Sequence, residues 1–384
     1  MTRRLPDVPL PDQSGRTWLI TGATSGIGYE TAKAASRAGA RLVLASRDEG
    51  RAQAAAATLP GPAEVIVLDL ESQRSVREAA AQVRGPVDVL VNNAGRVSPT
   101  RAVTVDGYET ILAANVLGPF AFTNLVLPQV TERVVIVGSN AHRQADRWLD
   151  LGDPHFRRRR WSIAGAYSQS KLLDMLWGLA LSRRLAGRLA VQLCHPGFAL
   201  TSIHRRTGSD LLDATVGRVL GLVAQSAEAG AQPTLVAATR DLPECSYVGP
   251  AGDHRGAPVL AGRSVTASNP ATAEAAWLYL AGETGTDLPV HLGGVRLAAM
   301  KKPSQAGKAR PQPRPAAVPP PATMPEKPHR PSAESERARE VLADDTPARR
   351  EAARTYLDSE RRAARTGLDT GAIKASPEQR PDSR

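Results

Sequence analysis

Thr21-Gly22-Ala23-Thr24-Ser25-Gly26-Ile27-Gly28 follows a short apolar run, 18–21, and precedes an Ala-rich stretch with helical spacing. A glycine-rich turn between a strand and a helix places backbone N–H groups and the helix N-terminus against a pyrophosphate. Gly22 permits the tight turn, Gly26 lets the backbone approach a phosphate, and Gly28 lets the helix pack closely on the strand. An ordinary glycine-rich turn is the alternative, but the position at a first strand–helix junction favours a dinucleotide site.

Short β-branched runs alternate with Ala-rich amphipathic stretches along the first two-thirds of the chain. Continuous apolar runs of this length are typical of parallel strands that are covered on both faces. The repeated strand–helix order predicts an α/β fold, a doubly wound parallel sheet, in one domain over residues 10–295. The predicted strands are 18–21, 42–45, 65–68, 87–91, 134–137 and 189–193, and the first predicted helices are 28–38, 50–57 and 72–83.

The composition narrows the class of protein. A hydrophobic share of 42% over 384 residues is enough for a large core, and two cysteines cannot build a disulfide framework or a thiolate zinc site. We therefore expect a cytoplasmic protein. No His/Cys/Asp cluster has metal-ligand spacing, so we predict no metal. No apolar run approaches the roughly 20 residues of a membrane helix, and no signal peptide is visible, so we expect no integral membrane segment.

Residues 296–384 differ in composition from the rest. The segment 301–331 is rich in proline and poor in bulky apolar residues, which predicts a flexible, solvated tail. Ala-, Arg- and Glu-rich pieces beyond Glu334 have too few apolar residues for more than marginal short helices. Of the net charge of +11, residues 301–384 supply 18 Lys and Arg against 12 Asp and Glu, a difference of +6. With 4% aromatic residues and no binding module, this charge does not predict a nucleic-acid partner.

The end of the second predicted strand indicates which nucleotide is preferred. An acidic residue there would bond a ribose 2′-OH, whereas an arginine accommodates a 2′-phosphate. The strand ends with Ser46 and Arg47, and Asp48 comes one position too late. Arg47 can clamp a phosphate and Ser46 can add a hydroxyl donor, which favours NADP(H) over NAD(H). A solvated loop arginine is the alternative.

Tyr167 and Lys171 lie four residues apart and therefore on one face of a helix. A neighbouring cation stabilises a phenolate and brings the Tyr pKa toward the working pH, as a general acid/base for an alcohol–carbonyl couple needs. The spacing alone is common in proteins, so it gains weight only from its context.

Taken together, these motifs resemble the short-chain dehydrogenase/reductase family. Its ordered pattern is matched by TGATSGIG, Asp69 in VLDL, Asn92-Asn93-Ala94-Gly95, Asn115 in LAANVLGPF, Ser139 in VVIVGSNAH, YSQSK at 167–171, and His195-Pro196-Gly197 with Thr201. The resemblance covers about residues 10–290 and implies a Rossmann-type fold. It also implies a catalytic tetrad of Asn115, Ser139, Tyr167 and Lys171.

The resemblance gives each member of the tetrad a role. Tyr167 would exchange a proton with the substrate oxygen, and Ser139 would hold that oxygen. Lys171 would bond the nicotinamide ribose and lower the Tyr167 pKa, while Asn115 would hold a water in a proton relay. The predicted cofactor-binding residues are Gly22, Thr24, Ser25, Gly26, Ile27, Gly28, Ser46, Arg47, Asp69, Leu70, Asn93, Ala94, Gly95, Tyr167, Lys171, Pro196, Gly197 and Thr201.

Several of these residues have a structural alternative. Ser139 would be a capping residue at a strand end, and Asn115 a helix-interior Asn satisfied by backbone. Asn92 and Asn93 would tie strands together. Cys194 and His195 fit buried strand-end residues better than catalysts or ligands, and His142 is expected on a surface loop.

The insert between Ser139 and Tyr167 resembles that of retinol-dehydrogenase-like and WW-domain-oxidoreductase-like members. This branch commonly prefers NADP(H) and acts on apolar alcohols and carbonyls, and members are often homo-oligomers. Four consecutive arginines, 157–160, predict a solvated, self-repelling loop, with an anionic substrate or partner as the sharper alternative. The segment 198–225 has one apolar helical face, typical of a substrate lid or of ordinary core packing.

We therefore expect an NADP(H)-dependent oxidoreductase that interconverts a small-molecule alcohol and a ketone or aldehyde. The alternative is a cofactor-sensing regulator or scaffold that recruits partners through its tail. An intact tetrad argues against the alternative, because a protein that only binds cofactor has no need of Tyr167. The sequence names neither the substrate nor the physiological direction nor the oligomeric state.

Overall fold

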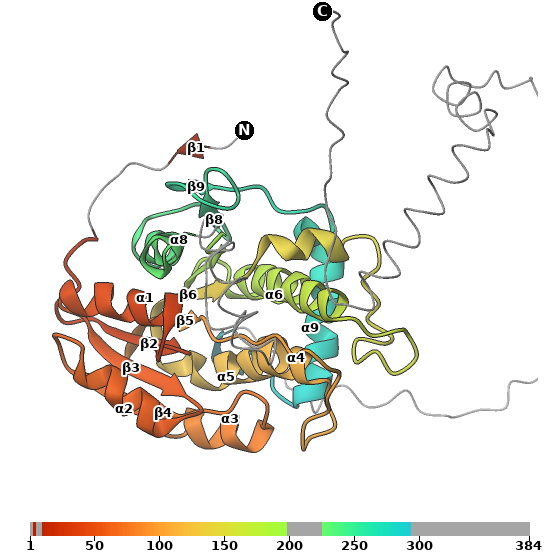
Figure 1. Ribbon diagram of the computed structural model, residues 1–384, viewed down its shortest axis with the longest axis horizontal. Coiled ribbons are helices and arrows are strands. Elements are labelled where there is room, and N and C mark those ends of the chain that lie inside the picture. The colour runs from red at the N-terminus through yellow and green to blue at the C-terminus, as the bar shows by residue number, and fades with distance from the viewer. Residues whose placement is uncertain (1–2, 5–9, 198–224, 293–384) are drawn as a thin grey trace, which may run out of the picture. The chain divides into compact units, whose positions relative to one another are not determined.

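The structure, a computed structural model, describes residues 3–4, 10–197 and 225–292 (Figure 1). The predicted tail 296–384 lies outside the described residues, as do Thr201 and all but the last residue of the predicted lid.

Within the described residues, nine strands form one sheet in the order β1-β9-β8-β7-β6-β5-β2-β3-β4. The seven strands from β8 to β4 pair in parallel, while β9 pairs antiparallel with β8 and β1. The strands are β1 (Arg3–Arg4), β2 (Thr17–Thr21), β3 (Arg41–Ser46), β4 (Ala63–Val67), β5 (Val87–Asn92), β6 (Val130–Val137), β7 (Ala190–Cys194), β8 (Tyr247–Pro250) and β9 (Pro258–Leu260).

The predicted doubly wound α/β sheet is confirmed, and each of the six predicted strands overlaps an observed one. The prediction missed the antiparallel edge formed by β8 and β9. These strands have only four and three residues, and Pro250 pairs with Pro258 at the end of the hairpin. Proline cannot donate to a ladder and is confined to edges and strand ends, so the sequence signal there is weak.

Helices cover both faces of the sheet (Figure 1). α1, α2 and α8 pack on one face, whereas α3, α5 and α6 pack on the other, with α9 lying on α6. The helices are α1 (Gly26–Arg37), α2 (Glu49–Ala57), α3 (Gln73–Ala80), α4 (Thr110–Leu112), α5 (Gly118–Val126), α6 (Ile163–Leu185), α8 (Ala227–Thr239) and α9 (Pro270–Thr284). The shorter or irregular turns are the π-helix η1 (Ala113–Leu117) and the 3₁₀ helices η2 (Leu127–Gln129), η3 (Asn140–Ala145), η5 (Thr266–Ser268) and η6 (Val290–Leu292).

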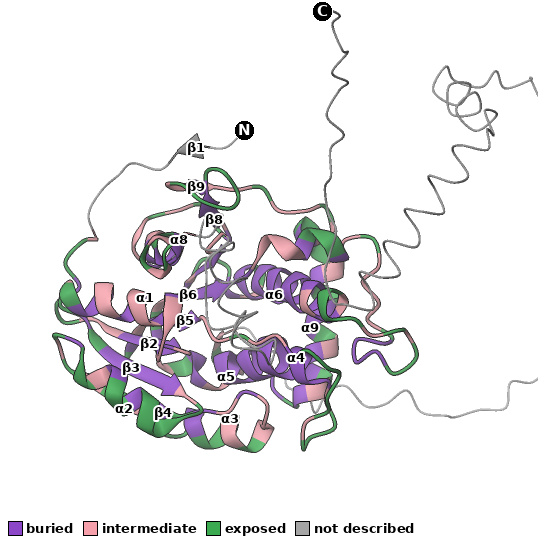
Figure 2. Ribbon diagram, viewed as in Figure 1, coloured by how far each residue is buried: buried purple, intermediate pink, exposed green. Residues whose placement is uncertain are grey.

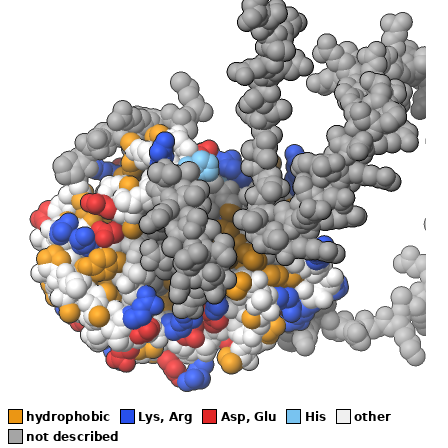
Figure 3. All heavy atoms as spheres, viewed as in Figure 1, with side chains coloured by type: hydrophobic (Ala, Val, Ile, Leu, Met, Phe, Trp, Pro, Cys, Tyr) orange, Lys and Arg blue, Asp and Glu red, His pale blue; other side chains and the backbone are white. Residues whose placement is uncertain are grey.

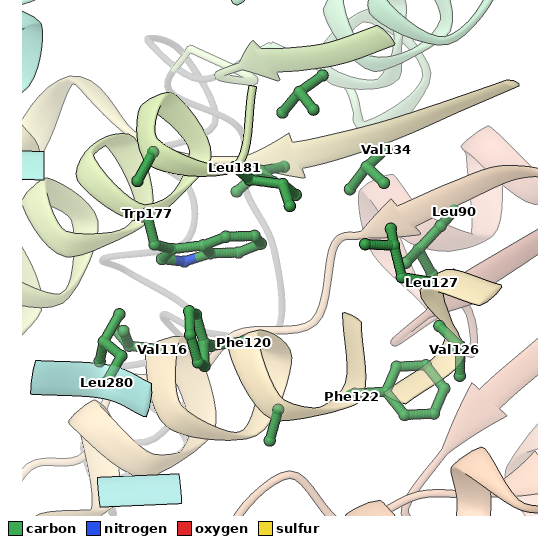
Figure 4. Close-up of a cluster of buried hydrophobic side chains, with 14 of the residues drawn as sticks. Leu90, Val116, Phe120, Phe122, Val126, Leu127, Val134, Trp177, Leu181 and Leu280 are labelled. Carbon is green, nitrogen blue, oxygen red and sulfur yellow. The ribbon is translucent and has the colours of Figure 1, made fainter. Parts of the chain in front are cut away.

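The larger core lies between the sheet and the layer of α5, α6 and α9. Trp177 of α6 points toward Phe120 of α5 (Figure 4), with ring centroids 6.1 Å apart and the rings perpendicular. Phe120 also meets Trp277 of α9 at 4.7 Å. All three side chains are fully buried, and Figure 2 shows α5 and α6 coloured largely as buried. The contact holds α9 against α5 and α6, and so fixes the helix that carries the site described below.

The expectation that no apolar stretch approaches the length of a membrane helix is wrong, because one helical stretch, Thr110–Gln129, is long and apolar enough to cross a membrane, with a mean hydropathy of 1.6. Within the fold, 94% of its most apolar window is buried. It comprises α4, η1, α5 and η2, which contribute many of the core residues. A helix that is apolar all round is expected in the centre of a large core, and this stretch occupies that position.

On the described surface in Figure 3, basic and acidic side chains lie interspersed. Some of them form exposed pairs, such as Arg74 and Glu78, 3.0 Å apart on α3. Mixed charge of this kind gives no broad field of one sign on that surface.

Candidate active site

The glycine turn after β2 is held in conformations that favour glycine. Gly22 and Gly26 have φ values of +69° and +57°. A Cβ atom on Gly28 would lie 2.3 Å from Asn93 Nδ2 and 2.4 Å from the Gly22 carbonyl oxygen. Gly28 therefore permits the close packing of α1 against the residue that follows β5.

The N-terminus of α1 lacks a side-chain cap. Ser25 is the N-cap residue, but its side chain makes no capping hydrogen bond. By contrast, Asp48, Ser72 and Ser162 each accept a bond from an amide in the first turn of α2, α3 and α6. The first amides of α1 thus remain available to a ligand, and the positive end of the helix dipole favours an anion there.

The carboxyl end of β3 presents a hydroxyl and two arginines to the same cleft. Ser46, Arg47 and Arg51 all line it. The Arg47 side chain is 68% exposed and lies 3.7 Å from a Glu71 carboxylate oxygen. Asp48 caps α2 by accepting a bond from the Arg51 amide at 2.9 Å. Asp48 also lines the cleft, and one of its carboxylate oxygens is thus engaged with its own helix.

The turn after β5 is tied to the glycine turn. Asn93 Nδ2 donates to the carbonyl oxygens of Thr21 and Gly22 at 2.9 and 3.2 Å. The Ala94 amide donates to Thr21 Oγ1 at 3.0 Å. Asn92, within β5, donates to Thr123 Oγ1. The Asn93 amide group therefore joins two strand ends, while Asn93, Ala94 and Gly95 still line the cleft.

Asp69 and Leu70 follow β4 at the cleft wall. One oxygen of Asp69 accepts a bond from the Glu71 amide at 3.0 Å. A Cβ on Gly118 would lie 2.3 Å from the Leu70 carbonyl oxygen, so α5 begins in tight contact with this segment. Glu71 in turn makes an ion pair with Arg96.

Asn115 lies in the π-helical turn η1 and is buried. Its Oδ1 accepts from the Arg96 amide at 2.7 Å, and its Nδ2 donates to the Arg96 carbonyl at 3.1 Å and to Ser170 Oγ at 3.0 Å. Ser170 Oγ donates to the Tyr167 carbonyl oxygen at 2.7 Å. Asn115 thus connects the loop after β5 to the helix that carries Tyr167. Single π turns within α-helices are frequent at functional sites.

Ser139 follows β6 and caps the short helix η3. Its Oγ accepts a bond from the Ala141 amide at 3.2 Å. The prediction of a surface-loop His142 is wrong, because this imidazole is fully buried. Its Nε2 accepts from the Ser264 amide at 3.3 Å, and its Nδ1 lies 2.7 Å from the Ser139 carbonyl oxygen. Two hydrogen bonds satisfy both ring nitrogens in the interior, and burial lowers the His142 pKa.

Tyr167 and Lys171 lie one turn apart on α6, with Nζ 5.9 Å from the phenol ring centroid. Lys171 is buried and donates to the Val137 carbonyl at 3.1 Å and to Asp174 Oδ2 at 2.9 Å. Burial lowers the pKa of Lys171, but the Asp174 carboxylate overrides this effect and holds the pKa above its ordinary value. The ammonium is therefore charged.

The end of β7 supplies a further wall. Cys194 and His195 are buried, as expected from the sequence. Burial raises the pKa of Cys194 to about 12 and lowers that of His195 to about 4, so both are neutral. His195 Nδ1 accepts a hydrogen bond from the Gly197 amide at 3.2 Å. Pro196 and Gly197 line the cleft.

These segments enclose one cleft with a volume of about 1010 Å³. It lies at the carboxyl ends of the parallel strands, around the point between β2 and β5 where the strand order reverses, as expected for a doubly wound sheet. The predicted site residues that line it are Gly22, Thr24, Ser25, Gly26, Ile27, Gly28, Ser46, Arg47, Asp69, Leu70, Asn93, Ala94, Gly95, Ser139, Tyr167, Lys171, Pro196 and Gly197. Asn115 lies behind this wall.

The loop 157–160 is not part of the described cleft lining. Arg157, Arg158 and Arg160 are exposed, as expected for a solvated loop, but the loop backbone also makes hydrogen bonds to a buried group. The amides of Arg157, Arg158 and Arg159 all donate to the buried Asp153 carboxylate. Burial alone would raise the pKa of Asp153, but these donors lower it to about 2. Arg159 also donates to Gln169 of α6 at 2.8 Å. The expected self-repulsion is offset because the backbone wraps one carboxylate.

Sequence reasoning missed several cleft residues. Arg51 follows Arg47 by one helical turn, which is a spacing that could have identified it. Asn140, Gln144, Asp253 and His254 also line the cleft but belong to no recognisable motif. Among the described residues, no group of three or more His, Cys, Asp or Glu side chains is placed to hold a metal ion.

Comparison with known proteins identifies the family. A family profile described as short chain dehydrogenase matches residues 16–148. Retinol dehydrogenase 13 of Homo sapiens is 36% identical over 249 residues, which cover 60% of this chain and 75% of that protein. The chain belongs to the short-chain dehydrogenase/reductase family.

Further relatives confirm the expected branch of this family. Polyprenol dehydrogenase of Mus musculus is 38% identical over 260 residues, covering 62% of this chain and 76% of that protein. WW domain-containing oxidoreductase of Danio rerio is 36% identical over 215 residues, which cover 50% of this chain and 52% of that protein. A crystal structure of an uncharacterized Mycobacterium paratuberculosis protein has 40% identity and a TM-score of 0.64, covering 75% of this chain and 100% of that chain. This short-chain dehydrogenase/reductase is thus an oxidoreductase of a family that uses NAD(P)(H) and small-molecule substrates.

Proposed function

We propose that this protein is an NADP(H)-dependent oxidoreductase that interconverts an alcohol and a ketone or aldehyde. The observation that carries the proposal is the shared cleft. Ser139, Tyr167 and Lys171 line the same cavity as the uncapped N-terminus of α1. A nucleotide bound through its phosphates at α1 would extend toward the phenol and hydroxyl.

The described residues fit a dinucleotide. The free amides of α1 would hold the pyrophosphate, and Asp69 with the turn 93–95 would flank the adenine side. Pro196 and Gly197 would border the nicotinamide end. The nicotinamide, when bound, supplies or accepts a hydride at the reacting carbon.

The choice of NADP(H) rests on the end of β3. Arg47 and Arg51 both face the cleft, and Ser46 adds a hydroxyl. Asp48 also lines the cleft, but one of its carboxylate oxygens is used as the cap of α2. Two guanidinium groups and a hydroxyl form a favourable site for a 2′-phosphate.

The proton chemistry would be carried out by Tyr167. Its phenol would donate a proton to the carbonyl oxygen during reduction and accept one from the hydroxyl during oxidation. Ser139 Oγ would hold that oxygen within reach. Lys171, whose Nζ is 5.9 Å from the ring centroid, would stabilise the phenolate. Asn115 would anchor α6 through Ser170 and border the path of a water behind Lys171.

The substrate is proposed to be an apolar alcohol or carbonyl compound. Two relatives named above are a retinol dehydrogenase and a polyprenol dehydrogenase, and both names denote apolar alcohols. Val97, Ile163 and Ala164 place apolar surface in the cleft of this chain. These side chains would contact the hydrocarbon part of such a substrate.

The test is to incubate the purified full chain with NADPH and a panel of ketones and aldehydes, and with NADP⁺ and the matching alcohols, including retinol and a polyprenol. Tyr167→Phe is the paired control, because it removes the exchangeable proton and keeps the ring. We expect turnover that falls at least 100-fold in the variant, within the usual range for a lost general acid/base. Turnover that persists in Tyr167→Phe would contradict the mechanism, and cofactor binding without any turnover would favour the cofactor-sensing alternative.

A further inference from the structure

Lys171 and Asp174 form an ion pair inside the fold, one turn beyond Tyr167 on α6. Their Nζ and Oδ2 atoms are 2.9 Å apart, and the two side chains are only 7% and 3% exposed. The other Asp174 oxygen accepts from Trp177 Nε1 at 3.3 Å. Asp174 does not line the cleft, and the hydride and proton transfers proposed above make no use of it.

The surroundings of Lys171 explain why a carboxylate is needed there. An ammonium buried without a counter-ion tends to release its proton, with shifts that reach 3–5 pH units for fully buried lysines. The titratable groups that act on Lys171 are Tyr167 and Asp174 on α6 and Cys194 on β7. Cys194 is a neutral thiol with a pKa of about 12. Asp174 is therefore the only carboxylate among them; burial raises its own pKa, and the Lys171 ammonium and the Trp177 N–H oppose that rise.

We propose that Asp174 is a positioning residue that keeps the Lys171 ammonium charged in the buried wall of the cleft, and so maintains the field that Lys171 exerts on Tyr167. The inference rests on the proposed function of Tyr167 as acid/base. Asp174 acts through Lys171, since the described cleft lining includes Lys171 but not the carboxylate.

Two opposing effects decide the direction of the expected change. The Lys171 charge lies 5.9 Å from the Tyr167 ring centroid and favours the phenolate. Asp174 lies seven residues from Tyr167, about 10 Å along the helix, so its opposing effect is weaker. If Asp174→Asn makes Lys171 neutral, both effects vanish and alcohol oxidation should require a higher pH. If Lys171 stayed charged, the reaction would instead require a lower pH.

The protonation of Lys171 can be measured without any substrate. The chain has seven lysines, of which only Lys33 and Lys171 lie in the described residues. Lysine labelled with ¹³C at Cε therefore gives few NMR signals in the full chain, and Lys171→Met assigns the relevant one. We expect Lys171 in the wild type to stay charged above the ordinary lysine range, and to titrate at clearly lower pH in Asp174→Asn. A wild-type Lys171 that titrates below the ordinary lysine range would overturn the proposal even if Asp174→Asn failed to fold, and so would an unchanged titration in the variant.

The second measurement is the pH dependence of alcohol oxidation, whose rate rises as Tyr167 ionises. We expect the rising limb to move to higher pH in Asp174→Asn. Leu176→Met is the matched control, because it alters the same buried cluster on α6 and removes no hydrogen bond to Asp174, and its limb should stay in place. A limb that moves down, or a rate that falls equally at all pH values, refutes the inference. A chain with no turnover would refute the proposed function, while the NMR titration would still decide the role of Asp174.

Discussion

Replacing Arg47 with alanine should weaken the preference for NADPH over NADH by about tenfold. A hydrogen bond to a charged partner contributes roughly 1.5–3 kcal/mol. The Arg47 side chain is 68% exposed and shares the neighbourhood with Glu71 at 3.7 Å, so solvent and the carboxylate both weaken its action. We therefore take the low end, about 1.5 kcal/mol, which corresponds to a loss of about tenfold in kcat/KM for NADPH. The Arg51→Ala variant should show a similar loss in kcat/KM for NADPH, because Arg51 lines the same side of the cleft.

The assay compares kcat/KM for NADPH and NADH at two salt concentrations. NADH lacks the 2′-phosphate and is the internal control, so its value should stay within about twofold of wild type. Arg74→Ala is the matched variant, because Arg74 is an exposed arginine (81%) paired with Glu78 and does not line the cleft. In the wild type, added salt should lower kcat/KM for NADPH more than for NADH. In Arg47→Ala this difference between the two cofactors should be much smaller. An unchanged NADPH/NADH ratio in Arg47→Ala and in Arg47→Ala/Arg51→Ala would refute the assignment of the phosphate site.

Two further predictions concern stability. Gly28→Ala places a Cβ 2.4 Å from the Gly22 carbonyl oxygen, so urea unfolding should show a loss of about 2 kcal/mol or more together with weaker cofactor binding. Gly282→Ala in α9, where a Cβ meets nothing within 4 Å, should be neutral or stabilising, and equal losses in both variants would argue against the clash. Asp153 has a pKa of about 2 in the fold against an ordinary value of 3.8, so its contribution is complete above pH 3.8 and disappears as the pH falls toward 2. Asp153→Asn should therefore lower the melting temperature at neutral pH and flatten the wild-type decline between about pH 4 and pH 2, and an unchanged decline would contradict the role given to Asp153.

The order of strands and helices followed from local patterns because each buried parallel strand is a continuous apolar run. β2, β3, β5 and β6 contain such runs, whereas the edge strand β4 is only partly buried and β7 includes Gln192. The glycine turn identifies the first junction without reference to distant residues. The hairpin of β8 and β9 gave no such signal, since seven residues interrupted by Gly and Pro carry little periodicity. Its pairing depends on the exposed edge of β7, which is a tertiary property.

For a similar reason, some residues of the candidate site could be predicted from the sequence and others could not. Tyr167 and Lys171 are linked by helical spacing, and Ser46 with Arg47 by a strand end. The burial of His142 depends on the Ser264 amide, 122 residues away. The ordering of the loop 157–160 depends on a carboxylate that the sequence alone does not distinguish from any other aspartate. Local sequence patterns therefore could not predict which distant residues pair with these polar groups.

The helix α6 explains why the core and the candidate catalytic groups cannot be separated. It is buried along most of its length, between the sheet and α9. Polar side chains on such a helix must find partners within the protein, since an unpaired buried group costs roughly 1–3 kcal/mol and a charge more. Lys171 accordingly pairs with Asp174, and Ser170 with Asn115. The burial that packs Trp177 against Phe120 also keeps water from the ammonium, so a substitution that loosens this core should alter the acid/base group as well as the stability.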